Sequence, residues 1–261
     1  MESILLLIFL ITVFFVILAV LFYISKEKFS VFDENDDQPL KFFYINLAHR
    51  EDRKERVLKE LENIGIHSSN IHRIDAIEKE DGNFGCALSH IKALETALEM
   101  NLHQVVILED DFQWKHSSEK TKVVIDEVMK LDGWGICLLA CNGKSKPSGE
   151  FTQRLLMTDE KLDKAVSICK GVPEFGCQTT SGYIIRRSYI PTLLNHWKSY
   201  IVYEEDKHPI SKNEKIWNAI DQTWKYLQQN DASDWITTNP ILGKQGPSYS
   251  DIIKIDVDYG I

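Results

Sequence analysis

Hydrophobic and polar positions divide the chain into one unbroken apolar stretch and a longer region of alternating short patterns. Residues 3–24 contain no charged side chain, and Leu, Ile, Phe and Val dominate them. These 22 positions are enough for a helix that crosses the roughly 30 Å hydrocarbon layer of a bilayer. A helix packed on a soluble core would show a polar stripe, and none is present. The pattern predicts a transmembrane anchor over residues 1–24.

The flanks of this stretch bear on its processing and orientation. A cleaved signal peptide would begin with positive charge and end at a small-residue cleavage site. Here only Glu2 precedes the stretch and no such site follows, so we expect an uncleaved anchor. Lys26 and Lys28 after the span favour a cytoplasmic folded domain, and the absence of an N-x-S/T sequon agrees. Two lysines do not decide the matter, and the side of the membrane stays open.

Beyond a polar, acidic linker over residues 25–40, short apolar runs alternate with helical patterns up to residue 261. Strands are expected at 41–47, 71–76, 104–108, 135–140, 181–185 and 234–237. Apolar residues at helical spacing predict helices over 54–65, 85–100, 119–130, 189–197 and 214–228. The polar region 142–178 is expected to be a long loop section or a small insertion, and the C-terminal residues a polar tail. The alternation predicts one α/β domain with a mixed, mostly parallel sheet flanked by helices.

Charge and cysteine content narrow the functional classes. The 261 residues carry a formal net charge of −9, which argues against a nucleic-acid partner because phosphate binding needs a basic face. The cysteines are Cys86, Cys137, Cys141, Cys169 and Cys177. Without a C-x-x-C pair, a zinc site is not expected. Cys137 and Cys141 fit buried core thiols, and a Cys169–Cys177 disulfide is the pairing considered for an oxidising compartment.

Three consecutive carboxylates, Glu109, Asp110 and Asp111, directly follow the clearest buried strand. Ligands of open α/β sheets bind outside the carboxyl ends of strands. Carboxylates packed together need solvent or a cation, and Mn²⁺ or Mg²⁺ with oxygen ligands would neutralise them and hold a diphosphate. The alternative is a solvent-facing acidic turn.

Other polar groups add weaker signals. The first strand ends in Tyr44, Asn46 and Leu47, and Arg50 and Arg53 follow at a helix start. Such an edge can hold a nucleoside, and the arginines can pair with phosphate, although charged helix starts are also ordinary surface. Ser89 and His90 lie inside the 85–100 helix, where a structural role is the simpler interpretation. Asp221 sits among apolar and aromatic residues and is either a general base with a raised pKa or a surface charge.

Taken in order, YINLxxRxDR, GCxLSHxxALExAL and VVILEDD resemble glycosyltransferase family 25, which includes lipopolysaccharide galactosyltransferases and collagen hydroxylysine galactosyltransferases. TSGYIIRR, AIDQTW and QGPSYSDI resemble the later motifs of the family, so the likeness runs over about residues 42–253. One departure is the closing motif, where many members have a fuller basic stretch and this chain has Lys244 and Gly246.

The resemblance implies a GT-A-like domain, a UDP-hexose donor (most often UDP-galactose), Mn²⁺ or Mg²⁺, and transfer to a hydroxyl of a glycan or hydroxylysine with inversion. Glu109, Asp110 and Asp111 match its metal motif. Asp221 is the expected base, with Glu174 as a looser candidate. The matching donor-site positions are Tyr44, Asn46, Leu47, Arg50, Arg53, Gly85, Ser89, His90 and Asp110.

Two other functions fit parts of the pattern. A catalytically silent, membrane-tethered protein could bind a sugar nucleotide or a glycan with the same pocket. A metal-dependent phosphohydrolase would need a nucleophilic Asp or a histidine cluster beside the metal, and neither is evident. The sequence leaves the acceptor, galactose against glucose, and the oligomeric state undecided, because a sugar epimer is distinguished by a few pocket residues outside the motifs.

Overall fold

The structure is a computed structural model that describes residues 38–141, 153–157, 166–170, 176–201, 219–239, 241–250, 252 and 255–258, with 153–157, 166–170, 233 and 248 as backbone only. The chain divides into two compact units, Met1–Gln38 and Pro39–Ile261. In the described ranges no helix is long and apolar enough to cross a bilayer. The predicted anchor over residues 1–24 and most of the linker lie outside those ranges, so both stay predictions.

An eight-stranded mixed sheet forms the centre of the second unit, with strand order β2-β1-β3-β8-β5-β9-β7-β6. Its strands are β1 (Lys41–Asn46), β2 (Ile71–Asp75), β3 (Gln104–Glu109), β5 (Ile136–Leu138), β6 (Gln153–Met157), β7 (Val166–Lys170), β8 (Gly182–Arg186) and β9 (Trp235–Asn239). β1 pairs in parallel with β2 and β3, and β5 with β9. β8 opposes β3 and β5, and β7 opposes β9 and β6. Only β8 and β7 therefore run against the others, which confirms a mixed, mostly parallel sheet.

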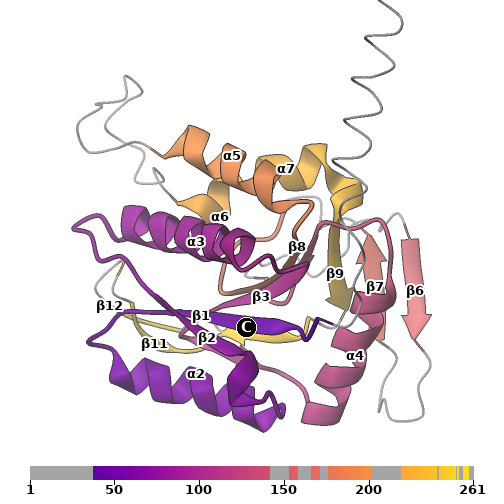
Figure 1. Cartoon of the computed structure of the whole chain (residues 1–261), viewed down its shortest axis with the longest axis horizontal. Helices are drawn as coiled ribbons and strands as arrows, with labels where there is room; N and C mark the ends of the chain where they lie inside the picture. Colours follow the sequence, from indigo (N-terminus) through magenta and orange to yellow (C-terminus); the bar gives the residue numbers. More distant parts are fainter. Residues whose placement is uncertain are drawn as a thin grey trace, which may run out of the picture. The chain divides into compact units, whose positions relative to one another are not determined.

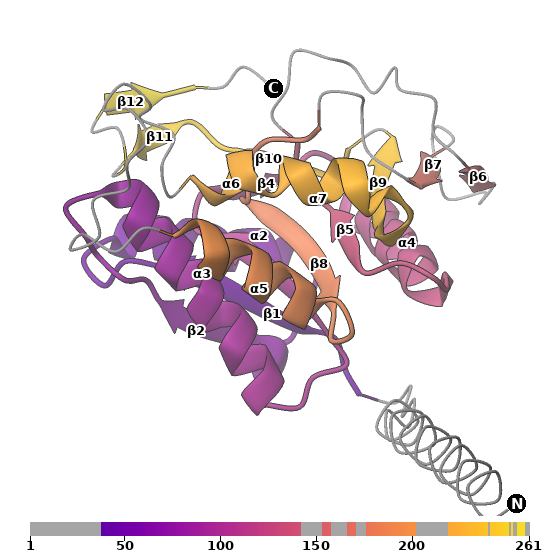
Figure 2. The same ribbon diagram turned by 90° about the horizontal axis from the view of Figure 1, so that it is seen from above.

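Helices cover both faces of the sheet, as Figures 1 and 2 show. They are α2 (Glu51–Asn63), α3 (Gly82–Glu99), α4 (Ser118–Lys130), α5 (Ile190–Tyr200), α6 (Ile220–Thr223) and α7 (Lys225–Asn230), with 3-10 turns η1 (Ser68–Asn70) and η2 (Ala232–Asp234). α2 and α4 pack on one face, and α3, α5, α6 and α7 on the other. The predicted α/β class is therefore confirmed.

Alternation along the strands supplies an apolar core on each face. On β1, Phe43 belongs to the core beneath α3 and α5, whereas Tyr44 belongs to the core beneath α2 and α4. Trp197 and Trp224 fill the first core and are fully buried. These two cores fix the strands whose ends carry the polar residues of the site.

Most expected elements are present, but three regions differ. The segment 142–178, expected to be a long loop section or a small insertion, contains the β6–β7 hairpin, whose short strands were not predicted because polar residues flank them. The C-terminal tail contains β10 (Gly243–Gln245), which pairs with β4 (Phe112–Trp114), and a β11 (Ser248–Ser250) to β12 (Ile255–Val257) hairpin. In the described part of 214–228, α6 and α7 meet at Trp224 instead of forming one helix.

The ring of Phe112 explains why two glycines flank the start of β4. Phe112 is fully buried, and a Cβ added at either Gly182 or Gly243 would overlap its ring. The β10 strand can therefore lie directly over the residue that follows the acidic triplet. This contact brings the C-terminal segment to the site.

Candidate active site

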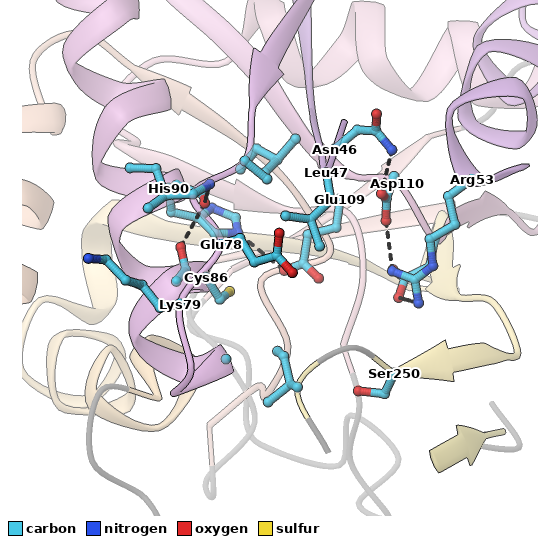
Figure 3. Close-up of a pocket in the computed structure, with 18 of the residues that line it drawn as sticks. Asn46, Leu47, Arg53, Glu78, Lys79, Cys86, His90, Glu109, Asp110 and Ser250 are labelled. Carbon is cyan, nitrogen blue, oxygen red and sulfur yellow. Dashed lines mark hydrogen bonds and ion pairs between the residues drawn. The ribbon is translucent and has the colours of Figure 1, made fainter. Parts of the chain in front are cut away.

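The polar residues of the site meet at one edge of the sheet. The parallel strands β1 and β3 end there with Asn46 and Glu109, and the antiparallel strand β8 begins there. The Glu109 N–H donates to the Ser181 carbonyl over 2.8 Å, which joins the two chain segments. A cavity of about 480 Å³ opens at this edge, between the strand ends, α3 and the C-terminal segment (Figure 3). Its volume is that of a small-molecule site.

The three carboxylates of the triplet all line this cavity, but each has its own partners. Glu109 turns toward α3, where its Oε1 lies 3.2 Å from His90 Nε2 and accepts a hydrogen bond from Thr180 Oγ1 over 2.7 Å. Burial raises the pKa of Glu109, but the hydrogen bond and charge of His90 outweigh it and leave that pKa below its ordinary value. Glu109 is therefore held as a carboxylate on the α3 side.

Asp110 points to the opposite side, toward α2 (Figure 3). Its two oxygens accept from Arg53 and from Asn46 Nδ2, both over 2.8 Å, and the Asp110–Arg53 pair is buried. Burial raises the pKa of Asp110, and the Arg53 guanidinium opposes that rise. Asn46 and Arg53, both predicted donor-site residues, thus anchor the middle carboxylate.

Asp111 differs from its neighbours because one of its oxygens has no protein partner. Oδ2 accepts from Gln245 Nε2 over 3.1 Å and lies 3.7 Å from Arg53, whereas the buried Oδ1 receives no hydrogen bond from the part of the chain that the structure describes. Burial, followed by the charge of Glu109, raises the pKa of Asp111 to about 7. An unsatisfied, buried carboxylate oxygen is costly unless a cation or another ligand satisfies it. Asp111 Oδ1 is therefore available as one oxygen ligand for a hard divalent ion.

The start of α3 shapes another wall of the cavity. A Cβ at Gly85 would collide with the Ile77 carbonyl, so the helix lies directly against the loop that follows β2. Ser89 Oγ donates to the Gly85 carbonyl and accepts from the Ile77 N–H, over 2.7 and 2.8 Å. Ser89 thus holds the loop that carries the cavity residues Glu78 and Lys79. His90 is fully buried, and its Nδ1 lies 3.0 Å from the Tyr183 hydroxyl.

The C-terminal segment forms the remaining wall. Gln245, Tyr249 and Ile252 line the cavity. Arginines of the α2 region hold this segment by its backbone: Arg53 donates to the Tyr249 carbonyl over 2.7 Å, and Arg56 to the Pro247 carbonyl over 3.4 Å. The closing motif therefore contacts the site through backbone groups and Gln245.

Asp221 lies beside the same edge but does not line the cavity. Its Oδ2 accepts from the Thr179 N–H over 3.3 Å, and the pKa of Asp221 is raised by burial while that hydrogen bond opposes the rise. Thr179 adopts a left-handed backbone with φ of 78°, which is uncommon for a β-branched residue. Thr179 and Thr180 therefore connect Asp221 to Glu109 through one strained turn.

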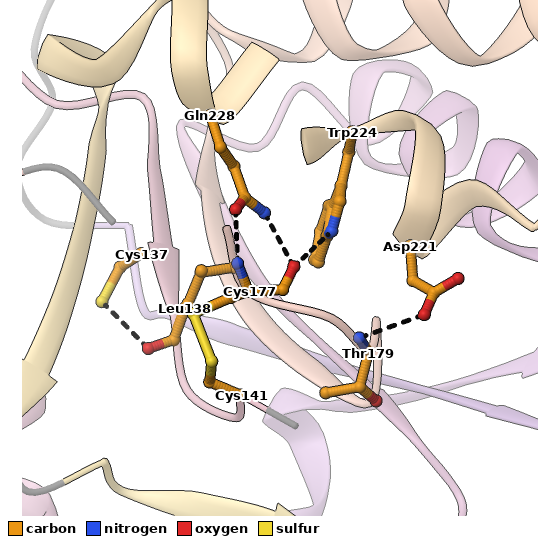
Figure 4. Close-up of a disulfide and its surroundings, with 8 residues drawn as sticks. All are labelled: Cys137, Leu138, Cys141, Cys177, Thr179, Asp221, Trp224 and Gln228. Carbon is orange, nitrogen blue, oxygen red and sulfur yellow. Dashed lines mark hydrogen bonds between the residues drawn. A yellow bond between two sulfur atoms is a disulfide. The ribbon is translucent and has the colours of Figure 1, made fainter. Parts of the chain in front are cut away.

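A disulfide fixes the segment that leads into this turn (Figure 4). Cys177 is bonded to Cys141, which lies shortly after β5, and the two Cα atoms are 5.1 Å apart. The Cys169–Cys177 pairing considered for an oxidising compartment and the assignment of Cys141 as a buried core thiol are therefore wrong. β5 and the start of β8 are neighbours in the sheet, an adjacency that the sequence does not reveal. Gln228 and Trp224 also hold the Cys177 backbone by hydrogen bonds.

Comparison with known protein families supports the resemblance found in the sequence. A sequence model described as Glycosyltransferase family 25 (LPS biosynthesis protein) matches residues 80–208. Slightly less than half of the chain thus matches glycosyltransferase family 25. The family 25 match contains α3, the acidic triplet and the Thr179–Thr180 turn.

Individual relatives are similar over short stretches. A candidate glycosyltransferase of Haemophilus influenzae is 41% identical over 64 residues, 24% of this chain and 22% of that protein. A glycosyltransferase 25 family member of Aedes aegypti is 22% identical over 120 residues, 36% of this chain and 20% of the relative. The matches thus span about a fifth of the length of these curated relatives. A glycosyltransferase involved in glycosylation of the PBCV-1 major capsid has a TM-score of 0.44 at 9% identity, covering 77% of this chain and 81% of that one.

The cavity contains most, but not all, of the predicted donor-site residues. The cavity is lined by Asn46, Leu47, Arg53, Gly85, Ser89, His90 and Asp110, together with Glu109 and Asp111. Tyr44 does not line it, because its side chain alternates to the core beneath α2. Arg50 does not line it either; its guanidinium pairs with Asp52 and donates to the Tyr249 carbonyl over 3.5 Å. Glu174 lies outside the described residues.

The sequence analysis did not identify three residues of the site, because nothing in their local sequence shows that they contact the acidic triplet or line the cavity. Cys86 lines the cavity one helical turn before His90, and burial followed by the charge of Glu109 raises the pKa of its thiol well above the ordinary value. Thr180 and Gln245 hold two of the carboxylates. Both lie in recognised motifs, but only the fold shows that they contact the triplet.

Proposed function

We propose that this protein is a glycosyltransferase that moves a hexose, with galactose as the sugar its family favours, from a UDP-sugar to an acceptor hydroxyl with a divalent cation. The observation that supports this function best is the buried Asp111 Oδ1, which lacks a protein hydrogen bond within the described residues and belongs to a residue that lines the cavity of about 480 Å³. The match of residues 80–208 to family 25 supports the reaction class.

The cation would be held by Asp111, with Glu109 and Asp110 close enough to add negative charge. When bound, Mn²⁺ or Mg²⁺ supplies charge stabilisation for a departing diphosphate. The chain's own contribution is to fix its ligands before substrate arrives: Gln245 and Arg53 orient Asp111, and Asn46 orients Asp110. Ligands that are already fixed lose little entropy when substrate binds.

Arg53 supplies positive charge directly beside the acidic triplet. Its guanidinium lies between Asp110, Asp111 and the Tyr249 carbonyl, at the cavity wall. This position suits a group that pairs with diphosphate oxygens while balancing the triplet. The nucleoside is then expected along Asn46 and Leu47, at the end of β1, as the family resemblance implies.

Asp221 is the proposed general base for an inverting, in-line displacement. Its raised pKa brings it nearer to the range in which a carboxylate removes a proton efficiently. Its link through Thr179 to the turn that holds Glu109 couples its position to the donor site. The acceptor is proposed to be a glycan or hydroxylysine hydroxyl that approaches from the Asp221 side.

Donor turnover tests the proposal directly. The full-length protein is incubated with UDP-galactose, UDP-glucose or UDP-N-acetylglucosamine, with Mn²⁺ or with a chelator, and UDP release is measured. We expect release from one donor, most strongly UDP-galactose, and loss of that release on chelation. Tight donor binding without release, in the presence of varied glycan acceptors, would instead support a silent binding protein.

We also propose that the folded domain works in an oxidising compartment, against the weak charge bias of Lys26 and Lys28. Support comes from the Cys141–Cys177 disulfide, since structural disulfides are rare where thiols are kept reduced. Alkylation of free thiols in freshly lysed cells, followed by mass spectrometry, should leave Cys141 and Cys177 unlabelled until a reductant is added. Labelling of both residues without a reductant would contradict the proposal.

A further inference from the structure

A cluster of metal-binding groups lies on the α3 side of the cavity, apart from Asp111. One ligand atom from each of Cys86, His90 and Glu109 lies within 4.8 Å of the other two. Cys86 and His90 are four residues apart on α3 and therefore project from the same face of the helix. Glu109 approaches them from the end of β3, and its Oε1 is 3.2 Å from His90 Nε2 (Figure 3).

We propose that Cys86, His90 and Glu109 bind a thiophilic divalent cation, of which Zn²⁺ is the natural example, with the fourth position open to the cavity. Thiolate and imidazole ligands favour zinc over Mg²⁺ or Mn²⁺. Three protein ligands with one open position is a common zinc arrangement. No zinc site was expected from the sequence, because it contains no C-x-x-C pair. The structure brings the third ligand, Glu109, from β3 to the two ligands on α3.

The geometry needs little adjustment to hold such an ion. At usual zinc bond lengths, tetrahedral ligand atoms stand roughly 3.3–3.8 Å apart. The His90–Glu109 pair already lies at about this separation, and the cluster has to contract by only about 1 Å overall. All three residues line the cavity, so an ion can enter from solvent.

Neighbouring side chains already orient two of the ligands. Tyr183 is fully buried, and its hydroxyl lies 3.0 Å from His90 Nδ1, which leaves Nε2 directed at Glu109. Thr180 donates to Glu109 Oε1. Metal-binding histidines usually have such a partner on the second ring nitrogen, and loss of such partners lowers metal affinity by about 10–100-fold.

A metal ion bound at this site should also affect transfer activity. This expectation rests on the proposed transferase function. An ion bound to Glu109 adds positive charge to the α3 wall and occupies space in the same cavity as the donor. Zn²⁺ should therefore inhibit Mn²⁺-dependent turnover, and the inhibition should be relieved in a variant without the Cys86 thiol.

Cobalt(II) provides the test, because a cobalt–thiolate bond has a charge-transfer absorption that oxygen ligands do not produce. Co²⁺ is added to the full-length protein, and Zn²⁺ is then titrated in to displace it. We expect the thiolate band to appear in the wild type and to be absent in Cys86→Ser, with at least about tenfold weaker zinc binding. This readout does not depend on transferase activity.

Two control variants test whether the band arises from this cluster. Cys137→Ala removes another free cysteine, which lies in the core beneath α4, and should keep the band. Asp111→Asn should also keep it, because Asp111 is not one of the three ligands. A wild type without the band, unchanged zinc affinity in Cys86→Ser, or loss of binding only in Asp111→Asn would overturn the proposal.

Discussion

Asp111→Asn is expected to reduce Mn²⁺-dependent UDP release by at least about 10²-fold. The variant keeps the shape of the side chain but loses the charge that holds the cation. Stabilisation of the transition state by a metal is worth several kcal/mol, and each loss of about 1.4 kcal/mol slows the reaction tenfold. Steady-state turnover with and without Mn²⁺ measures the effect. Asp126→Asn changes an exposed carboxylate on α4 and should leave turnover unaltered.

The same variant should be more stable than the wild type when metal is removed at high pH. Folding raises the pKa of Asp111 from 3.8 to about 7, so the folded state holds this proton more tightly than the unfolded state. The wild type therefore loses stability as the pH rises from about 4 to about 7, and the ionised carboxylate stays costly above that range. Asparagine has no such cost.

Urea unfolding in chelator at pH 5 and pH 8 measures this difference. The advantage of Asp111→Asn should be larger at pH 8, and Mn²⁺ should stabilise the wild type but not the variant. Equal pH dependence in both proteins would show that Asp111 is not the buried acid of the site. Normal turnover in a well-folded Asp111→Asn would remove the metal assignment itself.

Removal of the Cys141–Cys177 disulfide is expected to have the largest effect on stability. The bond joins residues 36 apart, and closing a loop of that length stabilises the native state by about 3–4 kcal/mol in the chain-entropy model. Urea unfolding of Cys141→Ala/Cys177→Ala should show a loss of this size. The bond also leads directly into the Thr179 turn, so its loss should weaken donor binding as well.

Reductant supplies the matched control for the disulfide. It should destabilise the wild type to about the level of the double variant and have no further effect on the variant itself. A wild type whose stability and donor affinity are indifferent to reductant would show that the bond contributes nothing to the folded domain. Cys86 and Cys137 are free in both proteins and so cancel in the comparison.

The strongly periodic parts of the fold were predictable from sequence. The runs at β1 and β3 are continuous and apolar because both faces of these strands are covered, and α2 and α4 have clear apolar stripes. α6 and α7 were harder to predict, because the helical spacing over 214–228 gave no sign of the break at Trp224, which the structure buries. β4, β10 and β11 are only three residues long and are fixed by pairing partners that local patterns cannot reveal.

The site shows the same division. The position of the acidic triplet followed from its place after a buried strand, a rule that needs no knowledge of other segments. The direction of each carboxylate did not, because it depends on His90, Arg53 and Gln245, which come from three separate elements. The disulfide partner of Cys177 was missed for the same reason, since only the sheet order brings β5 next to β8.

The backbone contact between α2 and the C-terminal segment also has a consequence for the timing of protein synthesis. Arg53 and Tyr249 are 196 residues apart, yet their hydrogen bond closes one wall of the cavity. A nascent chain can pair β1, β2 and β3 long before Gln245 and Tyr249 leave the ribosome. Until then the cavity lacks the wall formed by the C-terminal segment, and Asp111 lacks its hydrogen bond from the Gln245 amide. The sheet can therefore begin to form early, whereas the site is completed only after β10 and β11 have been synthesised.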